Sequence, residues 1–464
     1  MQPSGCQQAK NRSNPLYIGP PAGKGGRDEE TLFIRGWGPA RISLLVAGYP
    51  GLHDHLFGMK RVARNVSCGL DYLRDNKLKT LVLLFIGAWT TSASAMNFIH
   101  PGGINSAAEL DFVKGRIKAG AQPWKGEFDR LRDSGYASRG AHGARNINSD
   151  DQRAEASRDD AIAAYAQSLL WYFTDEDGYA RRSISILNSW ANLQGFTTGS
   201  DQDRLQAGWI GAVFASAAEI MRGHPDWAAR DVARFQDMFR RAFYPQLKTA
   251  SAWNGNVDLT QINALMAIAV FNEDQEEFSK ALDRLKIRNR AYFYLKSDGP
   301  RPSPIAGDGG DPQAFWLNPK RWIDGLTQET CRDNGHHSQF GLGSALHAAE
   351  IAWHQSVDVY GENQERYTAA MELLATQFLS GSMQGACKDD TPTADCYDAW
   401  EVGYNHYHNR KGVSLPNTKK LIAEQIRSKA PRAVCNLVFD MLTHSELPKV
   451  PNDAVNPSGG SGRF

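Results

Sequence analysis

Apolar residues recur at helical spacing through most of the chain beyond position 100. The segment Ser106-Ala-Ala-Glu109 has the form of a capping box, which is the signature of a helix N-terminus. Leu110, Val113 and Ile117 follow it on one helical face. The strict alternation that indicates a half-buried strand is hard to find. The pattern therefore predicts an all-α protein, with further helices over about 158–174, 178–192, 204–222, 228–247, 258–271, 275–295, 339–356, 363–379 and 417–429.

The connections between these helices are rich in Gly, Pro, Asn and Asp, and the longest runs from about Ser297 to Gly325. A long loop inside a compact domain is usually functional. The helices join into hairpins and show no TPR-like or HEAT-like repeat, which favours a closed toroid over an open solenoid. We therefore expect one domain with an α/α toroid fold, an incomplete α/α barrel of helical hairpins.

A different pattern precedes the helices. Lys77 and Lys79 lead into the apolar run 81–89. Small residues then follow up to Ala95, and this order is typical of a secretory signal peptide. The apolar run is about half of the roughly 20 residues that a membrane helix needs, so we expect no membrane contact once the leader is removed. The leader predicts a secreted or periplasmic protein.

The segment before this leader is rich in Gly, Pro and Arg and lacks helical or strand periodicity. We interpret it as upstream sequence translated from a misassigned start. The alternative is a long disordered cytoplasmic arm in front of a signal anchor. The expected organisation is an upstream or disordered segment over 1–76, a signal peptide over 77–95, the toroid domain over 96–445 and a flexible tail over 446–464.

Four cysteines remain after the leader, an even number that suits an oxidising compartment. They allow three pairings. Cys387 and Cys396 flank a polar loop that contains Pro392, which favours a local disulfide between them and leaves Cys331 with Cys435. No CxxC pair or HExxH helix accompanies these cysteines, so we expect no bound metal and no other cofactor.

The charge balance excludes a global attraction to polyanions. The chain has 52 Lys and Arg against 51 Asp and Glu, a formal net charge of +1, so nucleic acid is not an expected partner. The 12 tryptophans indicate a broad aromatic core or surfaces that stack on flat ligands. Any charged binding site must be built locally, and three polar segments qualify.

The first polar segment is Trp253-Asn-Gly-Asn-Val-Asp258, directly before an apolar helix. In a purely structural interpretation, Asn-Gly is a turn and Asn256 or Asp258 caps the helix. In a functional one, Asn254 and Asn256 donate to a ligand carboxylate at a helix N-terminus, where the helix dipole assists, and Trp253 contacts the ligand.

The second segment covers 329–339 and opens another helix, and the third covers 400–410. Charged and imidazole side chains so concentrated are costly to bury for structure alone, and a Tyr–His–Arg cluster can transfer protons. Within the second segment, the candidates are Arg332, His336, His337 and Gln339. Within the third, they are Tyr404, His406, Tyr407 and Arg410.

These residue types fit β-elimination better than hydrolysis. Glycoside hydrolysis uses two carboxylates that flank the bond, and each segment offers at most an isolated acid. Elimination from a 4-linked uronic acid requires donors that neutralise the substrate carboxylate and a base that removes the C5 proton. Amides and His supply the first requirement, and a Tyr whose pKa is lowered by a cationic neighbour supplies the second.

Six motifs follow one another along the chain in a fixed order. They are His100-Pro-Gly-Gly103, Gln122-Pro-Trp124, Trp253-Asn-Gly-Asn256, Glu329-Thr-Cys-Arg-Asp-x-x-His336, Gly341-Leu-Gly343 and Tyr404-Asn-His-Tyr-His-Asn-Arg410. Together they resemble the alginate lyase-like polysaccharide lyases over about 100–430. The resemblance implies an α/α toroid with a groove across one face, and cleavage of an anionic polysaccharide such as alginate or glucuronan without a metal.

The resemblance also implies roles for single residues. Asn256 neutralises the substrate carboxylate, and His336 is a neutral base or a second neutraliser. The alginate lyases proper have a His directly after this Asn, where this chain has Val257, so that role moves to His336 or His337. Tyr407 or Tyr404 acts as base and acid; we favour Tyr407 because its neighbours in sequence include His406, His408 and Arg410.

Two other classes of function stay open. A secreted α/α-toroid glycoside hydrolase would be favoured if Asp258, Asp333 or Glu401 faced one another across the groove. A carbohydrate-binding protein without turnover would keep the groove and lack an activated base. For the lyase we expect a monomer.

Overall fold

The computed structural model describes residues 96–448, apart from positions 252, 303, 306, 307, 309, 310 and 432. The expected signal peptide and the segment before it lie outside the described residues, as does most of the expected tail. Within this part of the chain helices dominate, which confirms the all-α prediction. Its strands are two residues long each, β1 (Asn146–Ile147) and β2 (Gly195–Phe196), and they pair in parallel.

Four long helices form the inside of the toroid. They are α5 (Gln152–Thr174), α7 (Asp201–Met221), α10 (Gly255–Asn272) and α14 (His336–His354). All 18 residues of α10 are buried, because its sequence is apolar or small on nearly every side. The four pack in chain order, α5 on α7, α7 on α10 and α10 on α14. They carry the main hydrophobic core.

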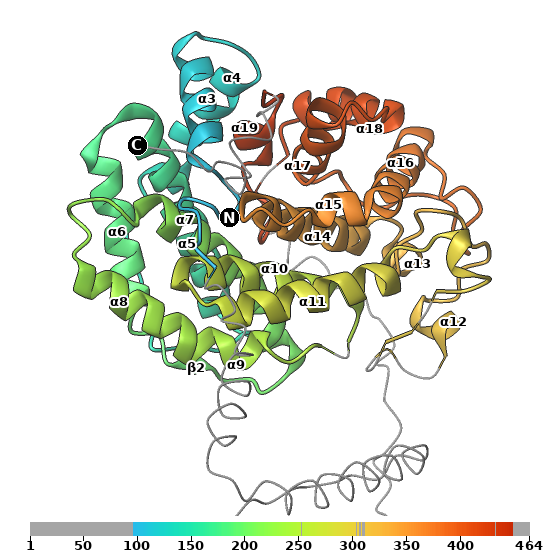
Figure 1. Cartoon of the computed structure of the whole chain (residues 1–464), viewed down its shortest axis with the longest axis horizontal. Coiled ribbons are helices and arrows are strands. Elements are labelled where there is room, and N and C mark those ends of the chain that lie inside the picture. The colour runs from blue at the N-terminus through green and yellow to red at the C-terminus, as the bar shows by residue number, and fades with distance from the viewer. Residues whose placement is uncertain are drawn as a thin grey trace, which may run out of the picture. The chain divides into compact units, whose positions relative to one another are not determined.

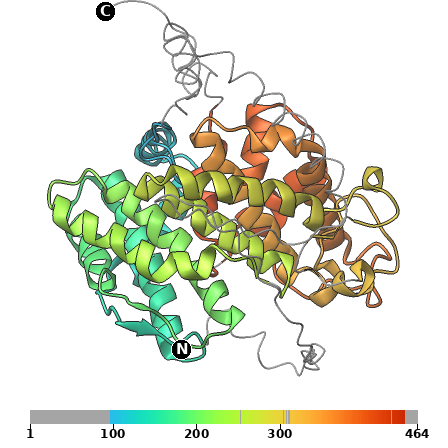
Figure 2. The ribbon, with the colours of Figure 1, turned by 60° about the horizontal axis from the view of Figure 1, so that its bottom comes forward.

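Four more helices return on the outside. They are α6 (Asp177–Trp190), α8 (Ala229–Met238), α11 (Gln275–Tyr292) and α16 (Gln364–Ser380). Each is amphipathic; α11, for example, buries Phe278, Ala281 and Leu285 at helical spacing. Figure 1 shows α10 and α11 between α6 and α8 on one side and α14 and α16 on the other, and Figure 2 shows the same order in a second orientation.

The two ends of the described chain meet and close the ring. The helices involved are α3 (Ala107–Lys118), α4 (Trp124–Arg132), α17 (Glu401–Tyr404) and α19 (Asp440–His444). α14 packs on α17, α17 on α19, and α19 on both α3 and α4. The capping box predicted at Ser106 and Glu109 is present at the start of α3.

Short elements complete the described chain. No helix among the described residues is both long and apolar enough to cross a membrane. The short helices are η1 (Gly135–Ala137), η2 (Phe239–Phe243), α9 (Tyr244–Leu247), η3 (Lys296–Asp298), α12 (Pro312–Phe315), α13 (Thr330–Asp333), α15 (Val359–Glu362), η4 (Asn405–Arg410), α18 (Pro416–Leu421) and η5 (Ile422–Arg427).

A buried ion cluster joins the two ends of the ring. Arg410 of η4 donates to Glu350 of α14 over 2.6 and 3.0 Å, and it also pairs with Glu109 of α3. His354 Nε2 lies 3.0 Å from a Glu109 oxygen. Ligand atoms of the two glutamates and His354 lie within 4.8 Å of one another, as in a metal site. Because Arg410 and a protonated His354 together balance the charges of both carboxylates, we assign the cluster to ring closure, and Arg410 is not available to substrate.

The disulfide differs from the predicted pairing. Cys331 of α13 bonds to Cys387, and Cys396 is free. The predicted local bridge from Cys387 to Cys396 is therefore wrong, and so is a bridge from Cys331 to Cys435. The reason is that Asn334 holds the intervening loop against α13: its side-chain amide donates to the carbonyl oxygens of residues 389 and 391 over 3.0 and 2.8 Å.

Candidate functional site

The N-terminal ends of the inner helices meet at one face of the toroid. β1 precedes α5 and pairs with β2, which precedes α7. The Ser251 hydroxyl, just before α10, donates to Asp201 at the start of α7. The backbone N–H of Asn256 donates to Glu329, just before α13 and α14, over 3.1 Å. Helix N-termini carry partial positive charge, so this face favours an anionic ligand.

Asn254 caps α10. Its side-chain oxygen accepts from the backbone N–H of Val257 over 3.2 Å. The expectation that Asn256 or Asp258 is the cap is therefore wrong. Trp253, which precedes the cap, is 51% exposed and can stack on a sugar ring.

A fully buried carboxylate, Glu329, organises the polar groups around it. The Asn256 side-chain amide lies 2.7 Å from both of its oxygens, and Arg332 Nη1 donates to it over 2.9 Å. The Tyr292 hydroxyl lies 3.3 Å from Glu329 and 3.4 Å from the His337 carbonyl oxygen. The structure thus brings the first two predicted segments together.

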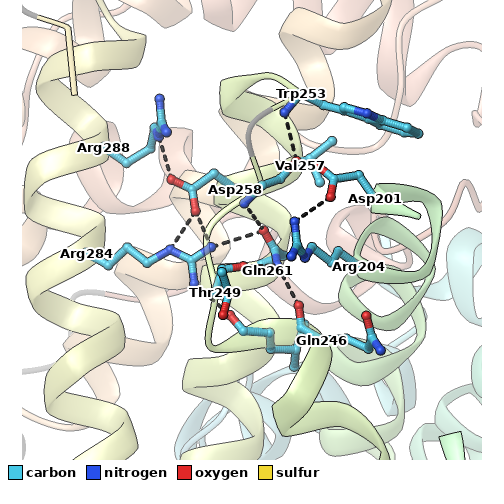
Figure 3. Close-up of polar contacts among 12 residues, drawn as sticks. Asp201, Arg204, Gln246, Thr249, Trp253, Val257, Asp258, Gln261, Arg284 and Arg288 are labelled. Atoms are coloured by element: carbon cyan, nitrogen blue, oxygen red, sulfur yellow. Dashed lines mark hydrogen bonds and ion pairs between the residues drawn. The ribbon is translucent and has the colours of Figure 1, made fainter. Parts of the chain in front are cut away.

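Asp258, in the first turn of α10, ties this helix to α11 (Figure 3). It accepts hydrogen bonds of 2.6 Å from both Arg284 and Arg288 of α11. Arg284 also donates to Gln261, whose amide donates to the carbonyl oxygens of Gln246 and residue 249. This network fixes the segment that leads to Trp253 at the edge of the site. Asp258 is a structural residue.

The hydrolase alternative also named Glu401 and Asp333, and each of these carboxylates is paired with a basic side chain. Glu401 is fully buried and pairs with Arg427. Asp333 pairs with His337; burial opposes its ionisation, but His337 outweighs this and holds the pKa of Asp333 below its usual range. Neither contact presents two facing carboxylates, so these geometries do not favour hydrolysis.

A sharp turn presents two imidazoles at the start of α14. Asn334 and Gly335 have φ of 50° and 120°, and a Cβ on Gly335 would lie 2.7 Å from the Phe378 ring, so glycine is required there. His336 follows directly. Burial, together with the nearby His337, lowers the pKa of His336 to about 4. His336 is therefore a neutral imidazole at neutral pH.

His336 Nδ1 is hydrogen-bonded to the hydroxyl of Tyr397, a residue that the sequence analysis did not select. Burial and the nearby Asp333 raise the pKa of Tyr397. Gln339 positions this tyrosine: its side-chain oxygen accepts from the Tyr397 N–H over 2.8 Å and its amide donates to the Asp395 carbonyl oxygen over 2.9 Å. Gln339 is fully buried, so it acts through Tyr397 and not on substrate.

The third predicted segment, 400–410, does not join the other two at Glu329. Tyr407 is fully buried, and its hydroxyl donates to the Tyr360 carbonyl oxygen over 2.9 Å. Burial raises its pKa, so the expectation that cationic neighbours lower it is wrong. His406 stacks on Tyr360 at 3.8 Å, and burial lowers its pKa to about 3. Tyr404 is buried and stacks on His408 at 4.7 Å. These contacts belong to the core around η4.

Comparison with known proteins gives a family match over part of the chain and a fold. The sequence model of the family described as alginate lyase matches residues 115–301. No curated protein sequence matches the chain.

Among solved structures, alginate lyase A1-III from Sphingomonas species A1 is 14% identical with a TM-score of 0.52, over 75% of this chain and 97% of that one. A variant of alginate lyase A1-III complexed with tetrasaccharide is 15% identical with the same TM-score, over 69% and 90%. At this identity the structures show the fold. With the family match, they confirm the predicted α/α toroid and the predicted resemblance to the alginate lyase-like polysaccharide lyases.

Proposed function

We propose that the protein is a polysaccharide lyase that cleaves 1,4-linked uronic acid polymers, such as alginate or glucuronan, by β-elimination. The observation that carries the proposal is the pair of neutral His336 and Tyr397, hydrogen-bonded to each other at the start of α14. The side chains of Asn256 and Arg332 both donate to Glu329. The Tyr292 hydroxyl contacts both Glu329 and the His337 carbonyl oxygen, and so links these donors to the start of α14.

The donors neutralise the substrate carboxylate. Arg332 is partly exposed and charged, and the N-termini of α10 and α14 add partial positive charge. Glu329 holds Arg332 and Asn256 in place, which limits the reorganisation needed when charge develops on the substrate. The carboxylate can then accept the electron pair that the C5–H bond releases.

The His336–Tyr397 pair moves the proton. Tyr397 acts as the base in its phenolate form, and neutral His336, hydrogen-bonded to its oxygen, positions it. The phenolate oxygen removes the proton from C5, and the C5–H electron pair forms the C4=C5 double bond as the C4–O4 bond breaks. Tyr397 then delivers that proton to O4 and returns to its phenolate form. This assignment replaces Tyr407 and Tyr404, which the structure buries in the core.

A substrate panel tests the proposal. The purified protein is incubated with alginate, its two block types, glucuronan and glycosaminoglycans, and the ultraviolet absorbance of the conjugated C4=C5 bond is followed. We expect absorbance with at least one uronate polymer. New reducing ends without absorbance would instead indicate a hydrolase, and binding without any cleavage would indicate a carbohydrate-binding protein.

We also propose export, on the sequence pattern over 77–95. Cleavage after Ala95 leaves a mature protein that begins at Met96. N-terminal sequencing of the protein from its native host tests this, and a mature chain that retains 1–76 would contradict it.

A further inference from the structure

A layer of polar side chains lies between the inner helices α10 and α14. The Thr260 and Ser344 hydroxyls, one from each helix, lie 3.1 Å apart. Three residues further along these helices stand Asn263 and His347, on the same helical faces as the two hydroxyls. A cavity of about 20 Å³ opens beside Asn263 and His347, which both line it. Apolar side chains of the core surround this layer, so its polar groups call for a specific explanation.

A tight turn from the C-terminal part of the chain reaches the same cavity. The backbone groups of Val434 and Leu437 are hydrogen-bonded to each other over 2.8 and 3.1 Å, and Asn436 lies in the turn that they close. Leu437 packs against Gly343 of α14, where a Cβ would lie 2.6 Å from the leucine side chain. The Asn436 amide donates to the Ser344 hydroxyl over 3.1 Å. Because this bond engages the nitrogen, the side-chain oxygen of Asn436 is left for the cavity that Asn436 lines.

Two buried polar atoms at the cavity have no hydrogen-bond partner within the described chain. They are a donor, Asn263 Nδ2, and an acceptor, Asn436 Oδ1, in residues that are 1% and 2% exposed. The Asp440 carboxylate also lines the cavity, with one oxygen 2.7 Å from His347 Nε2. A carboxylate can accept several hydrogen bonds, so Asp440 has room for a further donor. Buried polar atoms without partners are unfavourable, and the cavity therefore calls for an occupant that serves all three groups.

We propose that this cavity binds one buried water molecule as a permanent part of the fold. The water accepts a hydrogen bond from Asn263 Nδ2 and donates to Asn436 Oδ1 and to the Asp440 carboxylate. Three such bonds are usual for a buried water, and a cavity needs about 10–15 Å³ to hold one. The occupant must accept as well as donate, because Asn263 offers an N–H. A metal ion cannot accept a hydrogen bond, so the donor and acceptor set selects water.

Such a water joins parts of the ring that are far apart in the sequence. Asn263 belongs to α10, whereas Asn436 and Asp440 belong to the C-terminal segment, whose helix α19 packs on α3 and α4. The water is therefore a second link in ring closure, in addition to the ion cluster of Arg410. This role does not depend on the proposed function.

High-resolution crystallography of the purified protein tests the site directly. We expect one density peak in the cavity, at about 2.7–3.2 Å from Asn263 Nδ2, from Asn436 Oδ1 and from an oxygen of Asp440. A soak in thallium(I) distinguishes water from a monovalent cation. Anomalous density at the peak would show a cation and would overturn the inference, and so would a cavity without density.

A double-mutant cycle tests the link in solution. Asn263→Leu and Asn436→Leu each remove one partner of the water at similar side-chain volume, and Asn192→Leu, at an exposed position, is the matched control. Each single variant should lower Tm by about 2–4 °C, and the control should keep the Tm of the parent. Because both side chains bind the same water, the double variant should lose clearly less than the sum of the two single shifts. A loss equal to that sum would overturn the inference.

Discussion

Glu329 shows how one buried residue sets the roles of its neighbours. A fully buried carboxylate is costly unless donors surround it, and here the side chains of Asn256 and Arg332 are among those donors. Their orientation is thus fixed before substrate binds. Asn254 has a different role, since it caps α10. The two asparagines, which look alike in sequence, should respond differently to substitution.

Asn256→Ala should lower turnover about 10²- to 10³-fold, as the loss of one oxyanion donor does in other enzymes. Because the buried Glu329 loses a donor, the free energy of unfolding should also fall, by about 1–3 kcal/mol. Asn254→Ala removes the α10 cap and should lower the free energy of unfolding by about 1 kcal/mol. Steady-state kinetics and urea unfolding of both variants check this. Near-full activity of Asn256→Ala would remove Asn256 from the mechanism.

Tyr397→Phe should abolish formation of the unsaturated product and leave polymer binding nearly intact, because the hydroxyl acts in the transition state. Tyr407→Phe is the matched control, since its hydroxyl bonds the Tyr360 carbonyl oxygen in the core. The control should lose about 1–3 kcal/mol of stability and keep turnover within a few-fold. If Tyr407→Phe were inactive and Tyr397→Phe active, the site would be misassigned.

Activity should increase with pH across the alkaline range. The pKa of Tyr397 is raised, so its phenolate fraction grows only at high pH, whereas His336 with a pKa of about 4 stays neutral throughout. A pH profile of kcat/KM for the parent tests this. A profile that falls steadily above neutrality would contradict the Tyr397 assignment.

The sequence pointed to candidate residues that stand at helix N-termini. It did not predict contacts between residues that lie far apart in the chain. Asn256 and His336 each stand at a helix N-terminus, and residue type and position both point to them. Tyr397 meets His336 across 61 residues, and no spacing rule predicts such a contact. Tyr407 was favoured for its cationic neighbours in sequence, but adjacency along the chain does not determine what a buried hydroxyl meets.

At the scale of elements, periodicity located the long helices well and the short ones poorly. α10 and α11 begin within a few residues of the predicted starts, because an apolar stripe defines them. α13, a single turn, carries Arg332 and Cys331 but is too short to show a period. The π-helical turn η4 breaks the 3.6-residue pattern, which left the 400–410 segment without a predicted helix.

The Cys331–Cys387 disulfide should matter for both stability and activity. It closes a sequence separation of 56 residues and ties α13 to the loop that leads to Tyr397. Cys331→Ser with Cys387→Ser should lower the free energy of unfolding by roughly 2–4 kcal/mol in the chain-entropy account and reduce turnover. Cys396→Ser is the control and should change neither. Peptide mapping that found Cys387 bonded to Cys396 would contradict the structure.

At the scale of the whole molecule, ring closure depends on the ion cluster between α3, α14 and η4. Burial disfavours a charged His354, but Glu109 and Glu350 outweigh it and raise the pKa of His354 to about 9, above its ordinary value of 6.5. The His354 contribution to stability is therefore complete below pH 6.5 and lost as the pH rises through about 9. The pKa values of Glu109 and Glu350 are lowered, so their contribution disappears in acid.

The free energy of unfolding should therefore fall between about pH 7 and pH 10, by roughly 3 kcal/mol at most from this group. Urea unfolding across that range measures it. His354→Gln should flatten the alkaline part of the curve of unfolding free energy against pH. Arg182→Gln, on the exposed face of α6, is the control and should have the same curve as the parent. A parent curve that stays level up to pH 10 would show that the cluster does not carry this linkage.

Elimination itself is tested most directly by cleaving the preferred uronate polymer in water labelled with heavy oxygen and weighing the oligosaccharides. A lyase breaks the C4–O4 bond without adding water, so we predict products that carry a C4=C5 double bond and no labelled oxygen. Products that are saturated and carry one labelled oxygen at each new reducing end would show hydrolysis, and they would contradict the assignment of Asn256, His336 and Tyr397 to β-elimination.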